Sequence, residues 1–272
     1  MLKIELMKKI LCPTDFSETA NQAIAYAAMI AKKAEAELTL FNVQSIFALH
    51  DEEASPAIET IRERLEEQKN QVVKVFNIAC RIEVLPSDKN LTDIISQHAK
   101  GFDLIVMGTN GADDNYELFF GSRSYQIAKE VSVPVLLIPT GCTYRDIYTI
   151  GFALEYELGQ ELPMKQLATF ASLLEAKVTV LQVKSTYKRE EELNAEQIQA
   201  RTKMLYNLMD LEFDTIFSDE VSDSINGYIE KNNINVLALC SIHYNFIKTI
   251  FHSSVIKALS STAGYPIFIF HK

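Results

Sequence analysis

The second half of the chain repeats the first. Residues 36–43 (AELTLFNV) align without a gap with residues 176–183 (AKVTVLQV), and residues 102–107 (FDLIVM) align with residues 234–239 (INVLAL). Similarity that extends over half a chain indicates duplication of a whole domain, because solenoid repeats recur every 20 to 50 residues. The duplication therefore restricts the chain to two copies of one fold, the second shorter than the first.

Length and composition agree with this organisation. The 272 residues, of which 48% are hydrophobic and 23% charged, suffice for two globular domains of ordinary size, each with its own core. We predict one domain at residues 1–140 and a second at residues 145–272, with the boundary near residues 139–144.

Apolar runs of strand length alternate with helical patterns in the first half. Strands are expected at residues 9–13, 38–43, 81–85, 104–107 and 135–138. Helices are expected at residues 16–33, 58–75, 91–100 and 122–131. Such an alternation predicts an α/β fold in which each domain is a doubly wound, five-stranded parallel sheet of the Rossmann-like type, flanked by helices.

Ligands of doubly wound sheets bind beyond the carboxyl ends of the strands, where the strand order reverses. The segments richest in polar loop chemistry follow the first and fourth expected strands, at residues 13–15 and from Gly108 onward. We therefore expect the first and fourth strands to be neighbours.

Net charge and cysteine content restrict the classes of binding partner and the cellular compartment that we expect. The net charge of −10 argues against nucleic acid or an anionic membrane as a general partner. The four cysteines are scattered without a CxxC pair, which is typical of reduced thiols. Neither a membrane-spanning apolar stretch nor the apolar core of a signal peptide is evident, and we expect a cytoplasmic protein.

A glycine-spaced segment follows the fourth expected strand. Residues 108–122 read GTNGADDNYELFFGS, so Gly108 and Gly111 are followed after nine residues by Gly121 and Ser122. Glycines let the backbone approach a phosphate closely, and Ser122 would open a helix whose N–H groups and dipole face the anion. Because no phosphate-loop lysine is present, the segment would bind phosphate through its backbone.

The end of the first expected strand has two interpretations. Asp15, with Glu18 three residues later, fits an N-terminal capping box. The Asp15 carboxylate would equally accept hydrogen bonds from the base or sugar of a nucleotide, as an acidic group at a strand end does in other α/β nucleotide sites. The two roles are compatible.

Taken together, these motifs resemble those of the universal stress protein family. The resemblance rests on PTDFS at residues 13–17, MGTNG at residues 107–111, nine residues and then Gly121-Ser122, and VPV at residues 133–135. The internal repeat resembles the tandem, two-domain form of the family. Members that keep the glycine motif bind ATP, which implies an ATP-binding stress or signalling protein. The resemblance also allows for Mg²⁺ bound together with the ATP.

The resemblance also implies which residues form the site. Those lining the nucleoside would be Pro13, Thr14, Asp15 and the backbone of Val43. Those holding sugar and phosphates would be Met107, Gly108, Asn110, Gly111, Gly121, Ser122, Arg123 and Ser124.

Charged residues of this segment complicate the picture. Asp113, Asp114 and Glu117 would repel phosphate unless they face solvent or share a Mg²⁺. Arg123 stands where family members commonly have a smaller residue; it would add a charged contact to phosphate, or lie exposed on a helix surface.

The second half has lost the glycine motif. Its alignment with the first half places Cys240 at Gly108, and His243, Ser253 and Ser254 at Gly111, Gly121 and Ser122. We interpret this as degeneration, although Glu155 in place of Asp15 and the Ser253-Ser254 pair leave room for a different ligand. A metal site made of Cys240, His243 and His252 is a weaker alternative, since a fourth ligand and a standard spacing are missing.

The last expected strand of each half, at residues 135–138 and 267–270, is a continuous apolar run. In the resembled family, single domains dimerise through this strand, which implies that a tandem chain pairs its own halves as an internal pseudo-dimer. Burial under helices would explain the apolarity equally well, and a further homodimer stays open.

Three functions follow as candidates. The leading one is an ATP-binding protein in which nucleotide in the first domain controls shape or partner affinity, without catalytic residues. The second is a slow ATP hydrolase or a nucleotidyl transferase, which needs a positioned base and stabilisation of transition-state charge; the glycine motif contains neither a histidine nor a phosphate-loop lysine. The third is an interaction scaffold that binds no nucleotide, in which the glycines only shape turns.

Overall fold

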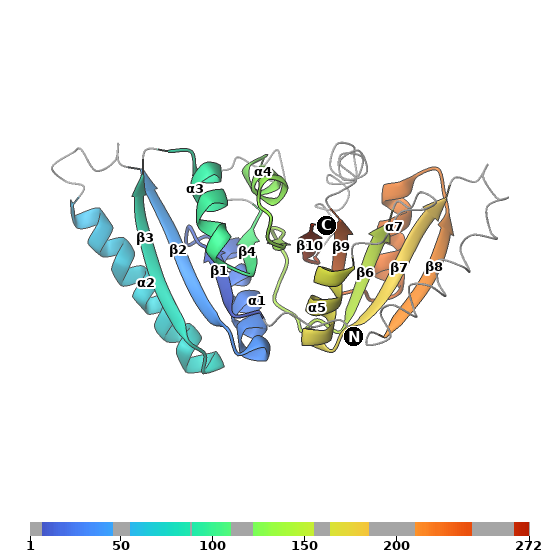
Figure 1. Ribbon diagram of the computed structural model, residues 1–272, viewed down its shortest axis with the longest axis horizontal. Coiled ribbons are helices and arrows are strands. Elements are labelled where there is room, and N and C mark those ends of the chain that lie inside the picture. The colour runs from blue at the N-terminus through green and yellow to red at the C-terminus, as the bar shows by residue number, and fades with distance from the viewer. Residues whose placement is uncertain are drawn as a thin grey trace. The chain divides into compact units, whose positions relative to one another are not determined.

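The computed structural model describes residues 7–45, 55–87, 89–109, 122–154, 164–184, 210–240 and 264–271. The chain divides into two compact units, Met1–Tyr144 and Arg145–Lys272. Each unit is an α/β sandwich built around a parallel sheet (Figure 1).

The first unit contains five parallel strands within the described residues. They are β1 (Lys9–Pro13), β2 (Glu37–Ser45), β3 (Cys80–Ser87), β4 (Leu104–Gly108) and β5 (Val135–Ile138). Their spatial order is β3-β2-β1-β4-β5, so the chain reverses direction across the sheet between β1 and β4. The predicted strands and the predicted neighbourhood of the first and fourth are confirmed.

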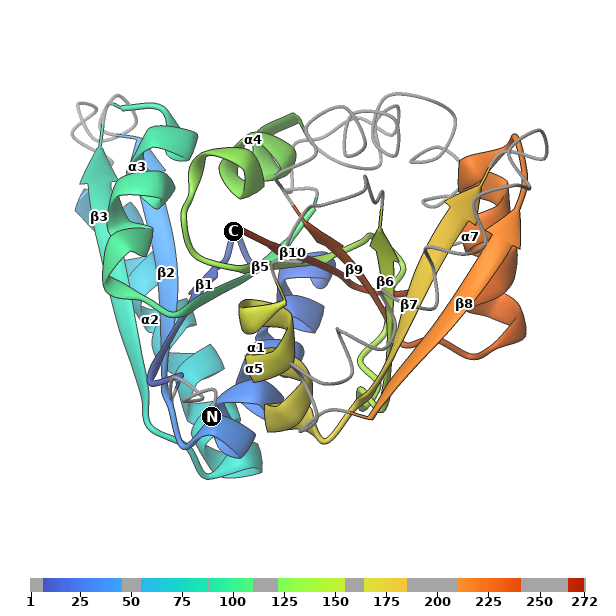
Figure 2. The same cartoon turned by 45° about the vertical axis from the view of Figure 1, so that its right-hand side comes forward.

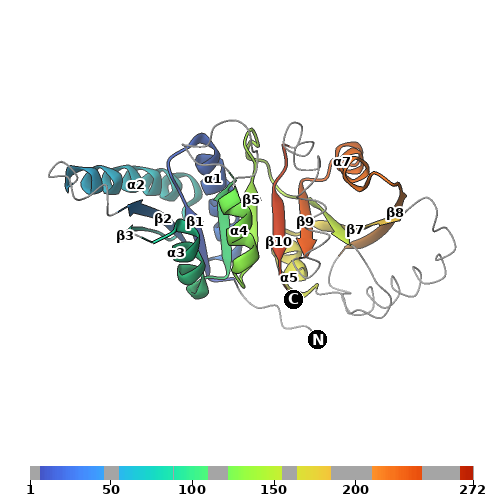
Figure 3. The same cartoon turned by 90° about the horizontal axis from the view of Figure 1, so that it is seen from above.

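Helices cover both faces of this sheet. They are α1 (Glu18–Ala34), α2 (Ser55–Phe76), α3 (Leu91–His98) with the 3₁₀ turn η2 (Ala99–Gly101), and α4 (Ser122–Glu130). Seen from above, α1 and α2 lie on one face, and α3 and α4 on the other (Figure 3). The small apolar face of α1, with Ala23, Ala27, Ile30 and Ala31 fully buried, lets the helix approach the strands closely.

The second unit repeats this architecture. Its strands are β6 (Thr149–Leu154), β7 (Lys177–Lys184), β8 (Leu211–Phe217), β9 (Val236–Cys240) and β10 (Ile267–Phe270), in the order β8-β7-β6-β9-β10 and all parallel. The described helices are α5 (Lys165–Leu174) and α7 (Val221–Lys231), and α7 packs beside β7 (Figure 2). The predicted fold class is therefore correct for this unit as well.

A hydrogen-bond pattern is shared by both units at the start of the central strand. In the first, the backbone N–H groups of Lys8 and Lys9 donate to Asp103 Oδ2 at 2.7 and 2.9 Å. In the second, those of Tyr148 and Thr149 donate to Asn235 Oδ1 at 2.9 and 3.0 Å. Because Asp103 and Asn235 both precede the fourth strand of their unit, the repeat seen in sequence extends to individual side-chain contacts.

The equivalence of Asp103 and Asn235 predicts the outcome of two substitutions. Asp103→Asn keeps an oxygen that accepts both N–H groups, so we expect a change in unfolding free energy below about 0.5 kcal/mol. Asp103→Ala removes the acceptor and is expected to destabilise by about 1 kcal/mol, since water replaces it only in part. Urea denaturation of both variants measures the difference; equal losses would show that the charge rather than the hydrogen bonds matters.

An ion pair between the second and third strands occupies one position in both units with opposite polarity. Arg81 Nε lies 3.3 Å from Glu37 Oε1 in the first unit, while Lys177 Nζ lies 2.6 Å from Glu212 Oε1 in the second. The strand registers make Glu37 equivalent to Lys177, and Arg81 to Glu212. The two units place the positive and negative residues on opposite strands, and the ion pair forms in both. We therefore interpret the pair as a cross-strand contact and not as a ligand site.

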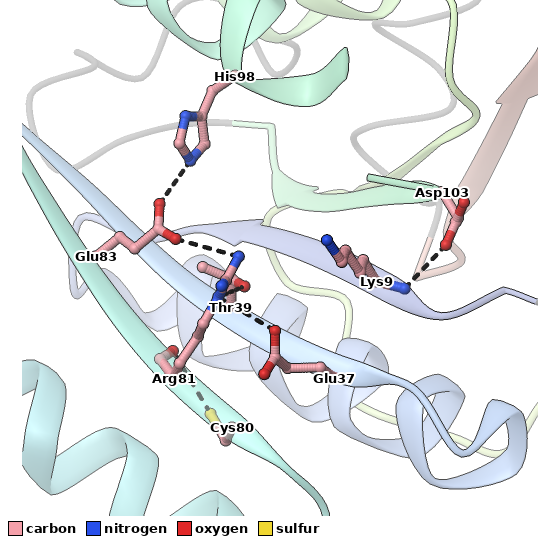
Figure 4. Close-up of polar contacts among 8 residues, drawn as sticks. All are labelled: Lys9, Glu37, Thr39, Cys80, Arg81, Glu83, His98 and Asp103. Carbon is pink, nitrogen blue, oxygen red and sulfur yellow. Dashed lines mark hydrogen bonds and ion pairs between the residues drawn. The ribbon is translucent and has the colours of Figure 1, made fainter. Parts of the chain in front are cut away.

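The first unit extends this ion pair into a network on the α3 face of its sheet. Figure 4 shows Arg81 between Glu37 and Glu83, with His98 of α3 reaching Glu83 at 2.6 Å. The His98 ring also stacks on Phe41, with ring centroids 4.5 Å apart and planes 9° apart. The network thus fastens α3 to strands β2 and β3.

None of the four cysteines forms a disulfide in the described part of the chain. Cys12 is fully buried in β1, and burial raises the pKa of its thiol far above the usual range. Burial likewise raises the pKa of Cys80 to about 12. Both therefore stay protonated and unreactive near neutral pH.

None of the helices in the described part of the chain combines the length and apolarity needed to cross a membrane.

Candidate functional site

The carboxyl ends of β1 and β4 form the point where the strand order of the first unit reverses. β1 pairs with β4 through Ile10 with Leu104 and Leu11 with Ile105. β2 is the other neighbour of β1. In open α/β sheets this edge is where ligands bind, and it brings together the residues that follow the three strands.

The turn from β1 to α1 is fixed by hydrogen bonds to its own side chains. Thr14, which is buried, donates its N–H to the Phe41 carbonyl at 2.9 Å, and its Oγ1 accepts the Phe16 N–H at 3.2 Å. Asp15 is exposed, and its Oδ1 accepts the Ser17 N–H at 3.0 Å. The turn therefore presents the Asp15 carboxylate at the surface of the strand-end region.

The capping interpretation of Asp15 is wrong in its position. The N-cap of α1 is Ser17, whose Oγ accepts the Ala20 N–H at 3.2 Å, and the helix begins at Glu18. Asp15 lies outside the helix and forms an Asx turn instead. Aspartate and serine both cap helices well. Which of the two becomes the N-cap depends on the residue between them, Phe16, which has a left-handed backbone conformation.

Asn42 was missed by the sequence reasoning. Strand β2 runs to Ser45, whereas its pairing with β1 ends at Phe41 opposite Pro13. The buried Asn42 side chain links β2 to the β1–α1 turn just beyond the last paired residues. Its Nδ2 donates to the Thr14 carbonyl at 2.7 Å, and its Oδ1 accepts from Gln44. Its signal in the sequence was an amide residue between the apolar Phe41 and Val43.

Beyond the residues that pair with β1, the backbone of Val43 faces the strand ends where the sequence predicts the ligand. In a parallel strand, alternate residues direct their N–H and C=O groups to the same side. The Phe41 carbonyl points toward β1, where it accepts from Thr14, so the backbone groups of Val43 point to that side too. The β1–β2 register does not reach Val43, which agrees with a role of its backbone in ligand binding.

Gly108 ends β4 against the first turn of α1. A Cβ atom at this position would lie 3.0 Å from Thr19 Cγ2 and 3.4 Å from the Ala20 backbone nitrogen. A side chain here would be tight against α1, so the glycine favours the close approach of strand and helix, in addition to any approach of a phosphate. Met107 before it and Thr109 after it are both buried.

Ser124 has a partner that the sequence did not predict. Its hydroxyl donates to the Thr109 carbonyl at 2.7 Å and lies 3.3 Å from the Gly108 carbonyl. A hydroxyl carries one proton, so in this arrangement Ser124 closes the connection from β4 to α4 and cannot also donate to a phosphate. Its assignment as a phosphate ligand stays a prediction that requires this proton to be redirected.

The remaining predicted residues are only partly described. Asn110, Gly111 and Gly121 lie outside the described residues, as do Asp113, Asp114 and Glu117. Ser122 and Arg123 are the first two residues of α4, so Ser122 opens a helix as expected. The roles assigned to these residues stay predictions.

The second unit differs at the corresponding edge. Cys240 ends β9, the position that Gly108 has in β4, and it is buried. Glu155, His243, His252, Ser253 and Ser254 lie outside the described residues. Within the part that the structure describes, no three His, Cys, Asp or Glu side chains are grouped as a metal site would require.

These features define a class of protein: an α/β protein with a doubly wound sheet and a polar turn and a glycine facing each other at its switch point. Residues 7–139 match the model of the universal stress protein family. The universal stress protein MJ0531 of Methanocaldococcus jannaschii is 29% identical over 140 residues, which are 49% of this chain and 82% of that protein. MJ0577 of the same organism is 26% identical over 156 residues, 49% of this chain and 95% of that protein.

Among solved structures, a universal stress protein from Archaeoglobus fulgidus has a TM-score of 0.74 at 13% sequence identity, covering 99% of this chain and 98% of that one. This likeness extends the shared fold to both halves. The domain formed by residues 7–139 therefore belongs to the universal stress protein family.

Proposed function

We propose that this chain is an ATP-binding stress or signalling protein of the cytoplasm whose nucleotide is held by the first domain, residues 1–140. The observation that carries the proposal is the meeting of the Thr14–Asp15 turn, the free edge of Val43 and Gly108 at the switch point of one sheet. In sequence, the glycine motif GTNGADDNYELFFGS continues from that point. Family membership supports the same ligand class.

Each part of this edge has a role in the proposal. The Asp15 carboxylate and the Val43 backbone accept and donate hydrogen bonds to the adenosine, with Pro13, Thr14 and Met107 beside it. The backbone around Gly108, Asn110, Gly111 and Gly121 and the start of α4 receive the phosphates. A Mg²⁺ ion, where present, enters bound to the phosphates, since this cation usually keeps several waters.

The proposal is tested with the purified full-length protein. Mass spectrometry after denaturation should release ATP, ADP or AMP, and Mg-ATP at about 100 times its dissociation constant should stabilise the protein by about 2.7 kcal/mol. For a unit of this size, that raises the melting temperature by roughly 5–10 °C. No released nucleotide together with no thermal shift would favour the nucleotide-independent scaffold.

We propose binding rather than turnover as the basis of function. A hydrolase needs a positioned base together with transition-state charge stabilisation. Among the predicted site residues that the structure describes, Asp15 is the one carboxylate, and none is a histidine. ADP release measured over many turnovers tests this. A steady rate that Gly121→Val abolishes would make the protein a slow ATP hydrolase.

For the second domain, residues 145–272, we propose the same family fold without nucleotide. Support comes from the aligned sequence, from the repeated strand order and from Cys240 at the end of β9. We further propose that the two domains pair as an internal pseudo-dimer through their apolar last strands, as the family resemblance implies.

A further inference from the structure

Phe16 has a backbone conformation that aromatic residues rarely adopt. Its φ is 67°, in the left-handed region, where a bulky residue without glycine's freedom is strained. The other non-glycine residues with positive φ in the described part of the chain lie one or two residues after the end of a helix, where this conformation is common; they are Glu35, Asn77, Glu175 and Asn233. Phe16 instead precedes a helix, so the usual explanation does not apply.

The conformation of Phe16 determines how Asp15 is oriented relative to helix α1. Phe16 lies between Asp15 and the N-cap Ser17, and the turn depends on Thr14 Oγ1 accepting the Phe16 N–H and on Asp15 Oδ1 accepting the Ser17 N–H. Rotation of Phe16 to negative φ would move Asp15 relative to the helix and break these short-range hydrogen bonds. Something must therefore hold Phe16 in place.

Arg64 of α2 contacts Phe16 from outside the turn. Its guanidinium carbon lies 3.9 Å from the centroid of the Phe16 ring, within the range of a cation–π interaction. Arg64 is exposed, and no described acidic side chain forms an ion pair with it. One helical turn later, Gln68 Nε2 donates to Asn21 Oδ1 of α1 at 2.8 Å, so the same face of α2 holds both the turn and the start of α1.

We propose that Arg64 is a positioning residue of the nucleotide site: by stacking on Phe16 it holds the strained turn that orients Asp15. The inference rests on the proposed function, because it assigns the turn to nucleoside binding. Arg64 acts through Phe16, and it therefore affects the nucleoside end of the ligand whatever the number of phosphates.

The first test needs no ligand. In Arg64→Met the aliphatic stem is retained and the charge is lost, so the turn should open more often. Hydrogen exchange of the Phe16 and Ser17 amides, followed by NMR, should accelerate several-fold in the full-length protein. Arg62→Met is the matched control, because Arg62 is exposed on the same helix about 200° around its axis. Unchanged exchange in Arg64→Met would overturn the proposal.

The second test uses adenosine and ATP as probes in calorimetric titrations. Loss of a cation–π contact corresponds to a factor of about five in affinity, and Arg64→Met should weaken both ligands by this same factor. Arg64→Lys should recover part of it, and in a Phe16→Leu background Arg64→Met should have no further effect. Weakening of ATP alone would instead make Arg64 a phosphate ligand. If the wild type binds neither probe, the proposed function fails, while the exchange experiment still decides the role of Arg64.

Discussion

Valine at position 121 is expected to abolish nucleotide binding by the full-length chain, while valine at position 253 leaves it unchanged. Both positions precede the serine that corresponds to a helix start in the alignment of the two halves, but only Gly121 belongs to the intact glycine motif. A branched side chain prevents the close approach of backbone N–H groups to a phosphate. We expect the dissociation constant of Mg-ATP to rise at least about 100-fold, which is about 2.7 kcal/mol.

Isothermal titration measures the affinity and the stoichiometry together. The wild type and Ser253→Val should bind one nucleotide per chain, and Gly121→Val none. Circular dichroism and the melting temperature of the ligand-free variants establish that each is folded. A stoichiometry of two, or a loss of binding in Ser253→Val, would show that the second half has kept a site despite its altered sequence.

Strands β4 and β5 were predictable because each is a continuous apolar run. The expected ranges 104–107 and 135–138 differ from the observed β4 (Leu104–Gly108) and β5 (Val135–Ile138) by at most one residue. Central parallel strands of this kind, covered on both faces, are almost entirely apolar, so the sequence marks where they begin and end. The neighbourhood of β1 and β4 followed from the position of the polar loops.

The start of α1 was predicted two residues too early, since Phe16 was placed in the helix. Asp15 and Ser17 both have the chemistry of an N-cap, and local sequence does not distinguish between them. In the structure, Phe16 has a φ of 67° and belongs to the strand-to-helix turn, so the helix begins after it and Ser17 is the N-cap.

The contacts of the site depend on residues distant in sequence. Asn42 meets Thr14 because the sheet pairs β1 with β2. Arg64 meets Phe16 because α2 packs beside α1, and Ser124 meets Thr109 because α4 returns to the end of β4. Gly108 shows the limit most clearly. A glycine after a strand predicts close approach, but the sequence cannot say that the approaching group includes Thr19 of α1.

Removal of the Phe41 ring is expected to have the largest effect on stability. Phe41 is 1% exposed, its ring stacks on His98 of α3, and its carbonyl accepts from Thr14 at the proposed site. A phenylalanine replaced by alanine in a packed core costs about 3–5 kcal/mol, because the lost burial is added to the cavity that remains. Since strand and turn are joined at this residue, Phe41→Ala should also loosen the Thr14–Asp15 turn.

Urea denaturation measures the overall loss of stability, and hydrogen exchange followed by mass spectrometry locates it. Faster exchange is expected in β2, α3 and the β1–α1 turn, while peptides of β7, the equivalent of β2 in the second unit, should stay as protected as in the wild type. Leu85→Ala is the matched control on the neighbouring strand β3, because Leu85 is already 39% exposed and its truncation should cost less than about 1 kcal/mol. A loss below about 1.5 kcal/mol in Phe41→Ala would mean that α3 packs on β2 without depending on this ring. The His98–Glu83 contact at 2.6 Å would then be the stronger attachment of the helix, and His98→Ala should destabilise the first unit more than Phe41→Ala.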